Sequence, residues 1–205
     1  YRKKVAKKNI SFAALGKEEC EVCIFKEHEC VQQEKECEIC LSHEQHRKKA
    51  IESRSAYKED SSMVNTIYNA YYSVDLQKVI MLPKLPGVKS VAFTRRIIAY
   101  NETFAPVGNK RLVKEKTEIP TAVTWHQREG GRSAQEVCST YYMFIKSPSN
   151  RDIINFTFWV DNCSSQNKCW YLYSLFCFAV NSPQHHSIQS VTLKYFERGH
   201  LHVGR

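Results

Sequence analysis

The cysteines and histidines near the start of the chain have the types and spacing that most clearly predict chemistry. Five of the nine cysteines are crowded between positions 20 and 40, and four of them form two Cys-x-x-Cys pairs. That spacing lets two thiolates bind one zinc ion, and a histidine follows each pair. The two pairs supply Cys20, Cys23, Cys37 and Cys40 as candidate zinc ligands, and the surplus candidates nearby are His28, Cys30, His43 and His46.

This ligand set leaves several arrangements open. It can form a four-cysteine site, a mixed Cys/His site or two zinc sites, and its abundance of ligands favours a structural role for the metal. The odd number and crowding of the cysteines favour a metal site in a reducing compartment over a disulfide framework. The alternative is a chance grouping of cysteines in a charged helical hairpin.

Two aspartates form a second candidate site. Asp75 lies inside an apolar segment that predicts a strand, and Asp161 directly follows another such segment. Carboxylates on neighbouring strands can bind Mg²⁺ or Mn²⁺, which activates water at a phosphodiester. Taken singly, Asp75 could be an acid that faces solvent from an edge strand, and Asp161 could cap a helix. Taken together, they predict a metal site of the catalytic type.

The composition favours an anionic partner, and DNA is the expected one. The 205 residues carry a formal net charge of +9, with a pI of about 9.1. A soluble basic protein without such a partner is the alternative. The candidate phosphate contacts, each of which can also be an ordinary solvated charge, are Arg95, Arg128, Arg132 and Lys168. No apolar run reaches the roughly 18 residues that span a bilayer, so we expect no membrane contact.

The chain divides by composition into three parts. Residues 1–17 form a basic tail, 18–63 form a Cys/His zinc module with a polar helix at 47–63, and 64–205 form an α/β domain. Segments rich in β-branched and aromatic residues predict strands at 68–82, 90–107, 121–127, 152–162 and 187–197. Helices are predicted at 133–147 and 165–181. This order predicts a mixed five-stranded sheet with flanking helices.

The α/β domain also contains motifs that resemble a known family. Transposase-derived proteins that are abundant in arthropod genomes are similar to this chain over residues 18–202. The segments that carry the resemblance are YSVDLQKVIMLPKLPGVKS, FTRRIIAYNETFAPVG, TWHQREGGRSAQEV and FWVDNCSSQNKCWYL, and DNCSSQNK is the most specific motif.

The resemblance implies a ribonuclease H-like domain of the transposase and integrase type. Members of that superfamily cut and join DNA with two aspartates, a third acid and two magnesium ions, and Asp75 and Asp161 match the two aspartates. In the resembling family a histidine usually follows each Cys-x-x-Cys pair, which matches His28 and His46 and implies that they are zinc ligands. In such folds the third acid lies on a helix after the fifth strand. Glu197 is the nearest acid, but it ends the predicted fifth strand, so we expect the helix with the third acid to be missing.

The function expected from these features is a transposase-like domain that binds DNA in the nucleus. Completed by a third acid, it would cut or join strands; as given, we expect it to be inactive. The alternative is a decayed or domesticated copy that binds nucleic acid or protein without catalysis. The sequence leaves the oligomeric state, including a homo-oligomer, open.

Overall fold

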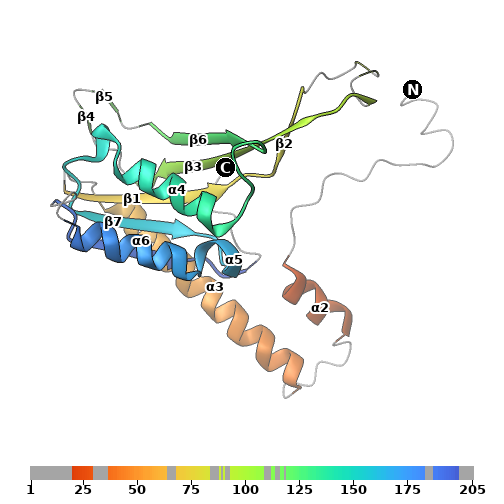
Figure 1. Ribbon diagram of the computed structural model, residues 1–205. Helices are drawn as coiled ribbons and strands as arrows, with labels where there is room; N and C mark the ends of the chain where they lie inside the picture. Colours follow the sequence, from red (N-terminus) through yellow and green to blue (C-terminus); the bar gives the residue numbers. More distant parts are fainter. Residues whose placement is uncertain are drawn as a thin grey trace.

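A computed structural model gives the fold of the chain (Figure 1). It describes residues 20–29, 37–63, 68–83, 88, 90, 93–108, 112–113, 116–117, 119–182 and 187–198. The predicted basic tail at 1–17 lies outside these residues. In the described part of the chain, no helix is both long enough and apolar enough to cross a membrane.

A six-stranded mixed sheet forms the centre of the protein. Its strands are β1 (Asn69–Leu76), β2 (Ile80–Leu82), β3 (Ile97–Pro106), β6 (Thr121–His126), β7 (Asn155–Val160) and β8 (Ser190–Tyr195). They follow the order β2-β3-β1-β7-β8, and β6 also pairs with β3. The strands β1, β7 and β8 are parallel to one another, whereas β2, β1 and β6 run antiparallel to β3.

The strand pairing explains why the sheet has six strands where the sequence predicts five. Ala99 of β3 pairs with β2 on one edge and with β6 on the other, and Glu102 pairs with β1 and β6 in the same way. The strands β1 and β2 therefore lie one after the other along the same edge of β3. The predicted strand at 68–82 is broken in two, and the other four predicted strands correspond to β3, β6, β7 and β8.

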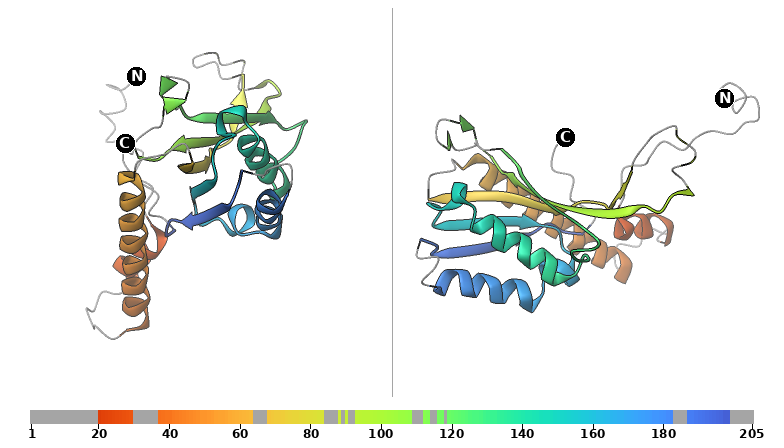
Figure 2. Two further views of the ribbon diagram at one scale, coloured as in Figure 1. Left: turned by 90° about the vertical axis from the view of Figure 1, so that its left-hand side faces the viewer. Right: turned by 45° about the horizontal axis from the view of Figure 1, so that its top comes forward.

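Helices cover both faces of the sheet (Figure 2). On one face, α4 (Ala134–Ile145) and α6 (Trp170–Asn181) enclose a core of aromatic side chains from the sheet, in which Phe104 and Phe158 are fully buried. On the other face lies α3 (Glu38–Ser62), where Tyr57 packs against Trp159 of β7. Asp60 at the end of α3 is also buried there, and its carboxylate accepts hydrogen bonds from Trp159 and from Lys194 of β8.

The helix α4 agrees with its sequence pattern. Ser133 is the N-cap, and its side chain together with that of Glu136 forms a capping box, which satisfies N–H groups at the start of the helix. The residues at helical spacing, Val137, Tyr141 and Phe144, are all buried against the sheet.

The other two predicted helices differ from the structure. The polar helix predicted at 47–63 begins earlier, at Glu38, because the Cys37 side chain accepts a hydrogen bond from the N–H of Cys40 and caps it. The helix predicted at 165–181 is divided into α5 (Ser164–Asn167) and α6, with Lys168 in a non-helical conformation between them.

The remaining elements are short. The helix α2 (Glu21–Glu29) precedes α3, and a 3₁₀ turn, η2 (Pro148–Asn150), follows α4. The strands β4 (Leu112–Val113) and β5 (Lys116–Thr117) form a small separate hairpin in the segment predicted to be a polar connection.

Candidate metal centre

Three of the predicted zinc ligands meet in the structure. Cys20 precedes α2, Cys23 lies in its first turn, and His46 lies in α3. Their ligand atoms are all within 4.8 Å of one another, and no other set of three Cys, His, Asp or Glu side chains in the described residues is so close. We call Cys20, Cys23 and His46 the metal centre.

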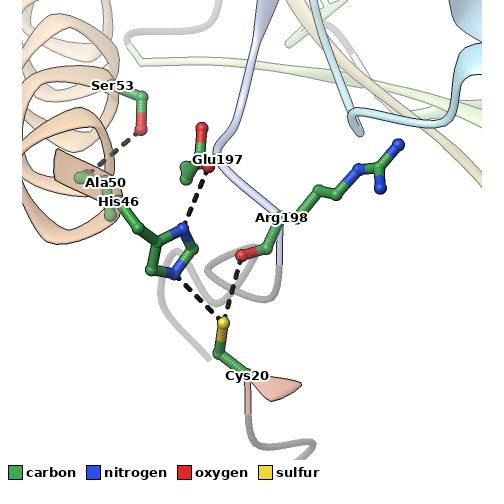
Figure 3. A network of polar contacts seen from close by, with 6 residues as sticks. All are labelled: Cys20, His46, Ala50, Ser53, Glu197 and Arg198. Atoms are coloured by element: carbon green, nitrogen blue, oxygen red, sulfur yellow. Dashed lines mark hydrogen bonds and ion pairs between the residues drawn. The ribbon is translucent and has the colours of Figure 1, made fainter. Parts of the chain in front are cut away.

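The geometry of the metal centre fits zinc. Cys20 Sγ lies 3.1 Å from His46 Nε2, and both side chains are buried (Figure 3). A tetrahedral zinc ion with bonds of about 2.3 Å to sulfur and about 2.0 Å to nitrogen holds two such atoms roughly 3.5 Å apart. Small side-chain shifts are therefore enough to admit the ion, and the group can hold a metal such as zinc.

Glu197 contacts the metal centre from the far end of the chain. It follows β8, and its Oε1 lies 3.0 Å from Nδ1 of His46, opposite the nitrogen that faces Cys20 (Figure 3). The tautomer in which Nδ1–H donates to this carboxylate leaves the lone pair of Nε2 directed at Cys20. The sequence suggested Glu197 as a third catalytic acid; its side chain instead contacts a candidate metal ligand.

The other predicted ligands do not join this group. Cys37 and Cys40 lie at the start of α3, where the Cys37 side chain caps the helix. His28 belongs to α2, but its side chain lies outside the described residues. A tetrahedral zinc ion would take a fourth ligand besides the metal centre, and these residues stay predictions for that position or for a second zinc site.

The second candidate site lies at the carboxyl end of the parallel strands. Figure 1 shows β1 and β7 pointing toward the same end of the sheet. Ser73 of β1 pairs with Trp159 of β7, the last pair of their register, and Asp75 and Asp161 each follow two residues later at this end of the sheet. β1 lies between β3 and β7, so Asp75 is not on an edge strand, although its side chain is exposed.

Asp161 is held in place by the loop that follows it. Its Oδ1 accepts hydrogen bonds from the N–H of Cys163 and the side-chain amide of Asn167. Cys163, not Asp161, is the N-cap residue of α5. Asp161 therefore lies two residues before the N-cap position of α5, and these two hydrogen bonds hold its carboxylate beside the end of β7.

A third carboxyl at this end of the sheet, that of Glu102, was missed by the sequence reasoning. Glu102 is on β3, is 2% exposed and shares the α4 face of the sheet with Phe104. Burial raises its pKa to about 7; the hydrogen bond from Thr140 opposes this shift, and the charges of Asp75 and Asp161 add to it. These couplings place the three acids in one electrostatic cluster.

The contacts of Thr140 agree with a protonated Glu102. The Thr140 hydroxyl is within hydrogen-bond distance of the Glu102 carboxyl and lies 2.7 Å from the carbonyl oxygen of Val137. The Thr140 hydroxyl has one hydrogen for two acceptors, the Glu102 carboxyl and the Val137 carbonyl. If the carboxyl supplies a hydrogen of its own, the hydroxyl can donate fully to Val137. A neutral Glu102 does so, and burial favours that form.

Tyr141 adds a buried hydroxyl to the same region. Its side chain is fully buried, and within the described residues its hydroxyl makes no hydrogen bond. Burial raises the pKa of Tyr141 well above its ordinary value, and the charges of Glu102 and Asp161 raise it further. The interior beside Asp161 is therefore a poor environment for additional negative charge.

The four candidate phosphate contacts lie at exposed positions outside the strands of the sheet. Arg128 and Arg132 are exposed in the turn before α4, and the Arg132 carbonyl accepts a hydrogen bond from Gln166 of α5. Lys168 is exposed just after α5, and its ammonium group lies over the ring of Tyr195. Arg95, predicted within a strand, lies before β3 and is exposed. These positions leave each side chain open to an anionic partner.

The fold and the metal centre define a mixed α/β protein with a Cys/His group that can hold a metal. No known family model, curated protein or solved structure matches this chain. The resemblance to transposase-derived proteins therefore stays a prediction.

Proposed function

We propose that the chain is a DNA-binding domain of the ribonuclease H-like transposase and integrase type that binds a divalent cation but does not cut DNA. The observation that carries this proposal is the parallel pairing of β1 with β7, which directs both strands, and with them Asp75 and Asp161, toward the same end of the sheet. Two carboxylates side by side repel each other when ionised, and Mg²⁺ or Mn²⁺ relieves that repulsion. In a ribonuclease H-like sheet the first and fourth strands are also neighbours, and β1 and β7 belong to the first and fourth predicted strands of this chain.

The absence of cleavage follows from the state of the remaining acids. Glu197, the only acid near the end of the predicted fifth strand, contacts His46. Glu102 interacts electrostatically with both aspartates, but its raised pKa keeps a large share of it neutral near pH 7. In the described residues, the three acids of the cluster do not bring their oxygens within 4.8 Å of one another. A two-metal cleavage site needs more negative ligands than this arrangement supplies.

Manganese binding tests the metal part of this proposal. We expect zinc-loaded protein to bind Mn²⁺ weakly, with a dissociation constant on the order of 0.1–1 mM, comparable to weak carboxylate sites. Asp161→Asn should lose this binding, because it removes one of the two charges. Asp152→Asn, at an exposed position before the other end of β7, is the matched control and should bind as before. Titration followed by the paramagnetic signal of free Mn²⁺ gives the constants; equal binding by both variants would contradict the proposed site.

Measurements of DNA binding test whether DNA is the partner of this protein. Four phosphate contacts, from Arg95, Arg128, Arg132 and Lys168, predict a loss of affinity of roughly 100-fold between 50 and 200 mM salt. Arg132→Gln should reduce the slope of log affinity against log salt concentration by the share of about one phosphate contact. Lys146→Gln, beyond the other end of α4, should leave this slope unchanged. Fluorescence anisotropy with a labelled duplex measures both, and the same duplex should remain uncut in Mg²⁺. Absence of binding at 50 mM salt would overturn the DNA assignment, and robust cutting would overturn the claim of inactivity.

A further inference from the structure

The metal centre combines residues that are remote from one another in the chain. Cys20 and His46 are 26 residues apart, and His46 and Glu197 are 151 residues apart. The Cys20 thiol also lies 3.5 Å from the backbone carbonyl of Arg198. The start of α2, the middle of α3 and the chain after β8 therefore meet at one point.

We propose that a zinc ion in the metal centre joins α2 and α3 to the end of β8, and that Glu197 is the residue that positions the ligand His46. The proposal concerns a different site from the aspartates, so it does not depend on the proposed function. Zinc bonds to Nε2 of His46 while Nδ1–H donates to Glu197, and a carboxylate in this position fixes the ring and increases its basicity.

Zinc binding releases protons from the cysteines of the metal centre. In the metal-free protein each cysteine carries a thiol hydrogen, and that of Cys20 can be donated to His46 Nε2 or to the Arg198 carbonyl. Zinc replaces the hydrogens of Cys20 and Cys23, so two protons are released, and His46 remains a neutral ligand. Cys20 is buried, and a buried thiolate is costly without a cation beside it, so loss of its proton is expected to accompany binding of the ion.

Glu197 is well suited to this role. The side chains of His46 and Glu197 are 7% and 21% exposed, so most of their surface is shielded from water. β8 lies beside β7 in the sheet, and the N–H of Phe196 donates a hydrogen bond to the carbonyl oxygen of Val160. Glu197 therefore projects from a backbone that the sheet already holds, and it can transmit the position of β8 to the metal ligand.

A charge-removing variant tests the positioning role. Glu197→Gln should weaken zinc binding tenfold to a hundredfold, measured by competition with a chromophoric chelator. The matched control is Glu129→Gln. Glu129 makes a comparable histidine–carboxylate contact, 3.8 Å to His126, at an exposed position. That variant should bind zinc like the unmodified protein. Wild-type affinity in Glu197→Gln would overturn the positioning role.

Hydrogen exchange on the unmodified chain tests the junction without any variant. Zinc should slow exchange in α2, at the start of α3 and also at the Phe196 N–H, which lies after the end of β8. In Glu197→Gln saturated with zinc, protection of the helices should persist and that of Phe196 should fall. Zinc-dependent protection confined to residues 20–62 would overturn the junction. Failure of manganese or DNA binding would leave these results unaffected.

Discussion

Replacing Cys20 with serine is expected to weaken zinc binding by about 100-fold or more and to unfold α2 at micromolar zinc. A serine hydroxyl is neutral and binds zinc poorly, and the apparent free energy of zinc binding in small modules, about 10–16 kcal/mol, is largely folding free energy. The helix α2 has nine residues, too few to be stable alone in water. The metal centre is thus expected to supply most of its stability.

The measurement combines helix content with metal affinity. Circular dichroism of Cys20→Ser should show a loss of helix signal corresponding to α2, and addition of a chelator to the unmodified protein should give the same loss. Cys177→Ser, on an exposed position of α6, is the matched control and should leave both quantities unchanged. If Cys20→Ser keeps its zinc affinity, the metal centre is not the zinc site.

Replacing Glu102 with glutamine is expected to stabilise the protein at pH 8 and to flatten its pH dependence. The pKa of Glu102 is about 7 in the folded protein and 4.5 for an ordinary glutamate, so the folded state binds more protons than the unfolded state between these values. The contribution of Glu102 to stability is then greatest below pH 4.5, falls as pH rises through this window and levels off above about pH 7. The difference between a pKa of about 7 and one of 4.5 corresponds to a loss of about 3 kcal/mol in the free energy of unfolding.

Glutamine removes this penalty because it cannot ionise. Its amide can still donate to the Thr140 hydroxyl, as a neutral carboxyl does. Urea denaturation between pH 5 and pH 8, in buffer without Mg²⁺ or Mn²⁺, measures the free energy of unfolding. Glu129→Gln, at an exposed position, should leave the pH dependence unchanged. A variant that is less stable than the unmodified protein at pH 8 would mean that ionised Glu102 is favourable in the folded state.

Local patterns predicted much of the fold. The alternation of buried residues in β1 and the helical spacing of Val137, Tyr141 and Phe144 are properties of neighbouring residues, so the sequence reveals them. Asp161 was predicted for the same reason, because the end of an apolar strand is visible locally. The break between β1 and β2 was not predicted, since it depends on how both strands pair with β3.

The candidate sites were predicted only in part, because they depend on distant contacts. Cys20 and Cys23 are a local motif, but the choice of His46 from several histidines, and its contact with Glu197, depend on how α3 meets β8. Glu102 did leave a signal that could have been used. It stands between Tyr100 and Phe104 at strand spacing, so a strand that buries both aromatic rings also buries the acid.

The central place of β1 has a consequence for how the chain folds during synthesis. β1 is the first strand of the sheet to be made, yet it lies between β3 and β7, and its partner in β7 follows 86 residues later, as in the pair Asn69 and Asn155. Until β7 emerges, one edge of β1 presents unpaired backbone groups beside aromatic side chains, the kind of surface on which chains associate. Pairing over such a distance is also slow. The nascent chain is therefore most vulnerable to aggregation between completion of β3 and completion of β7, and a ribosome that slows in this interval prolongs the exposure.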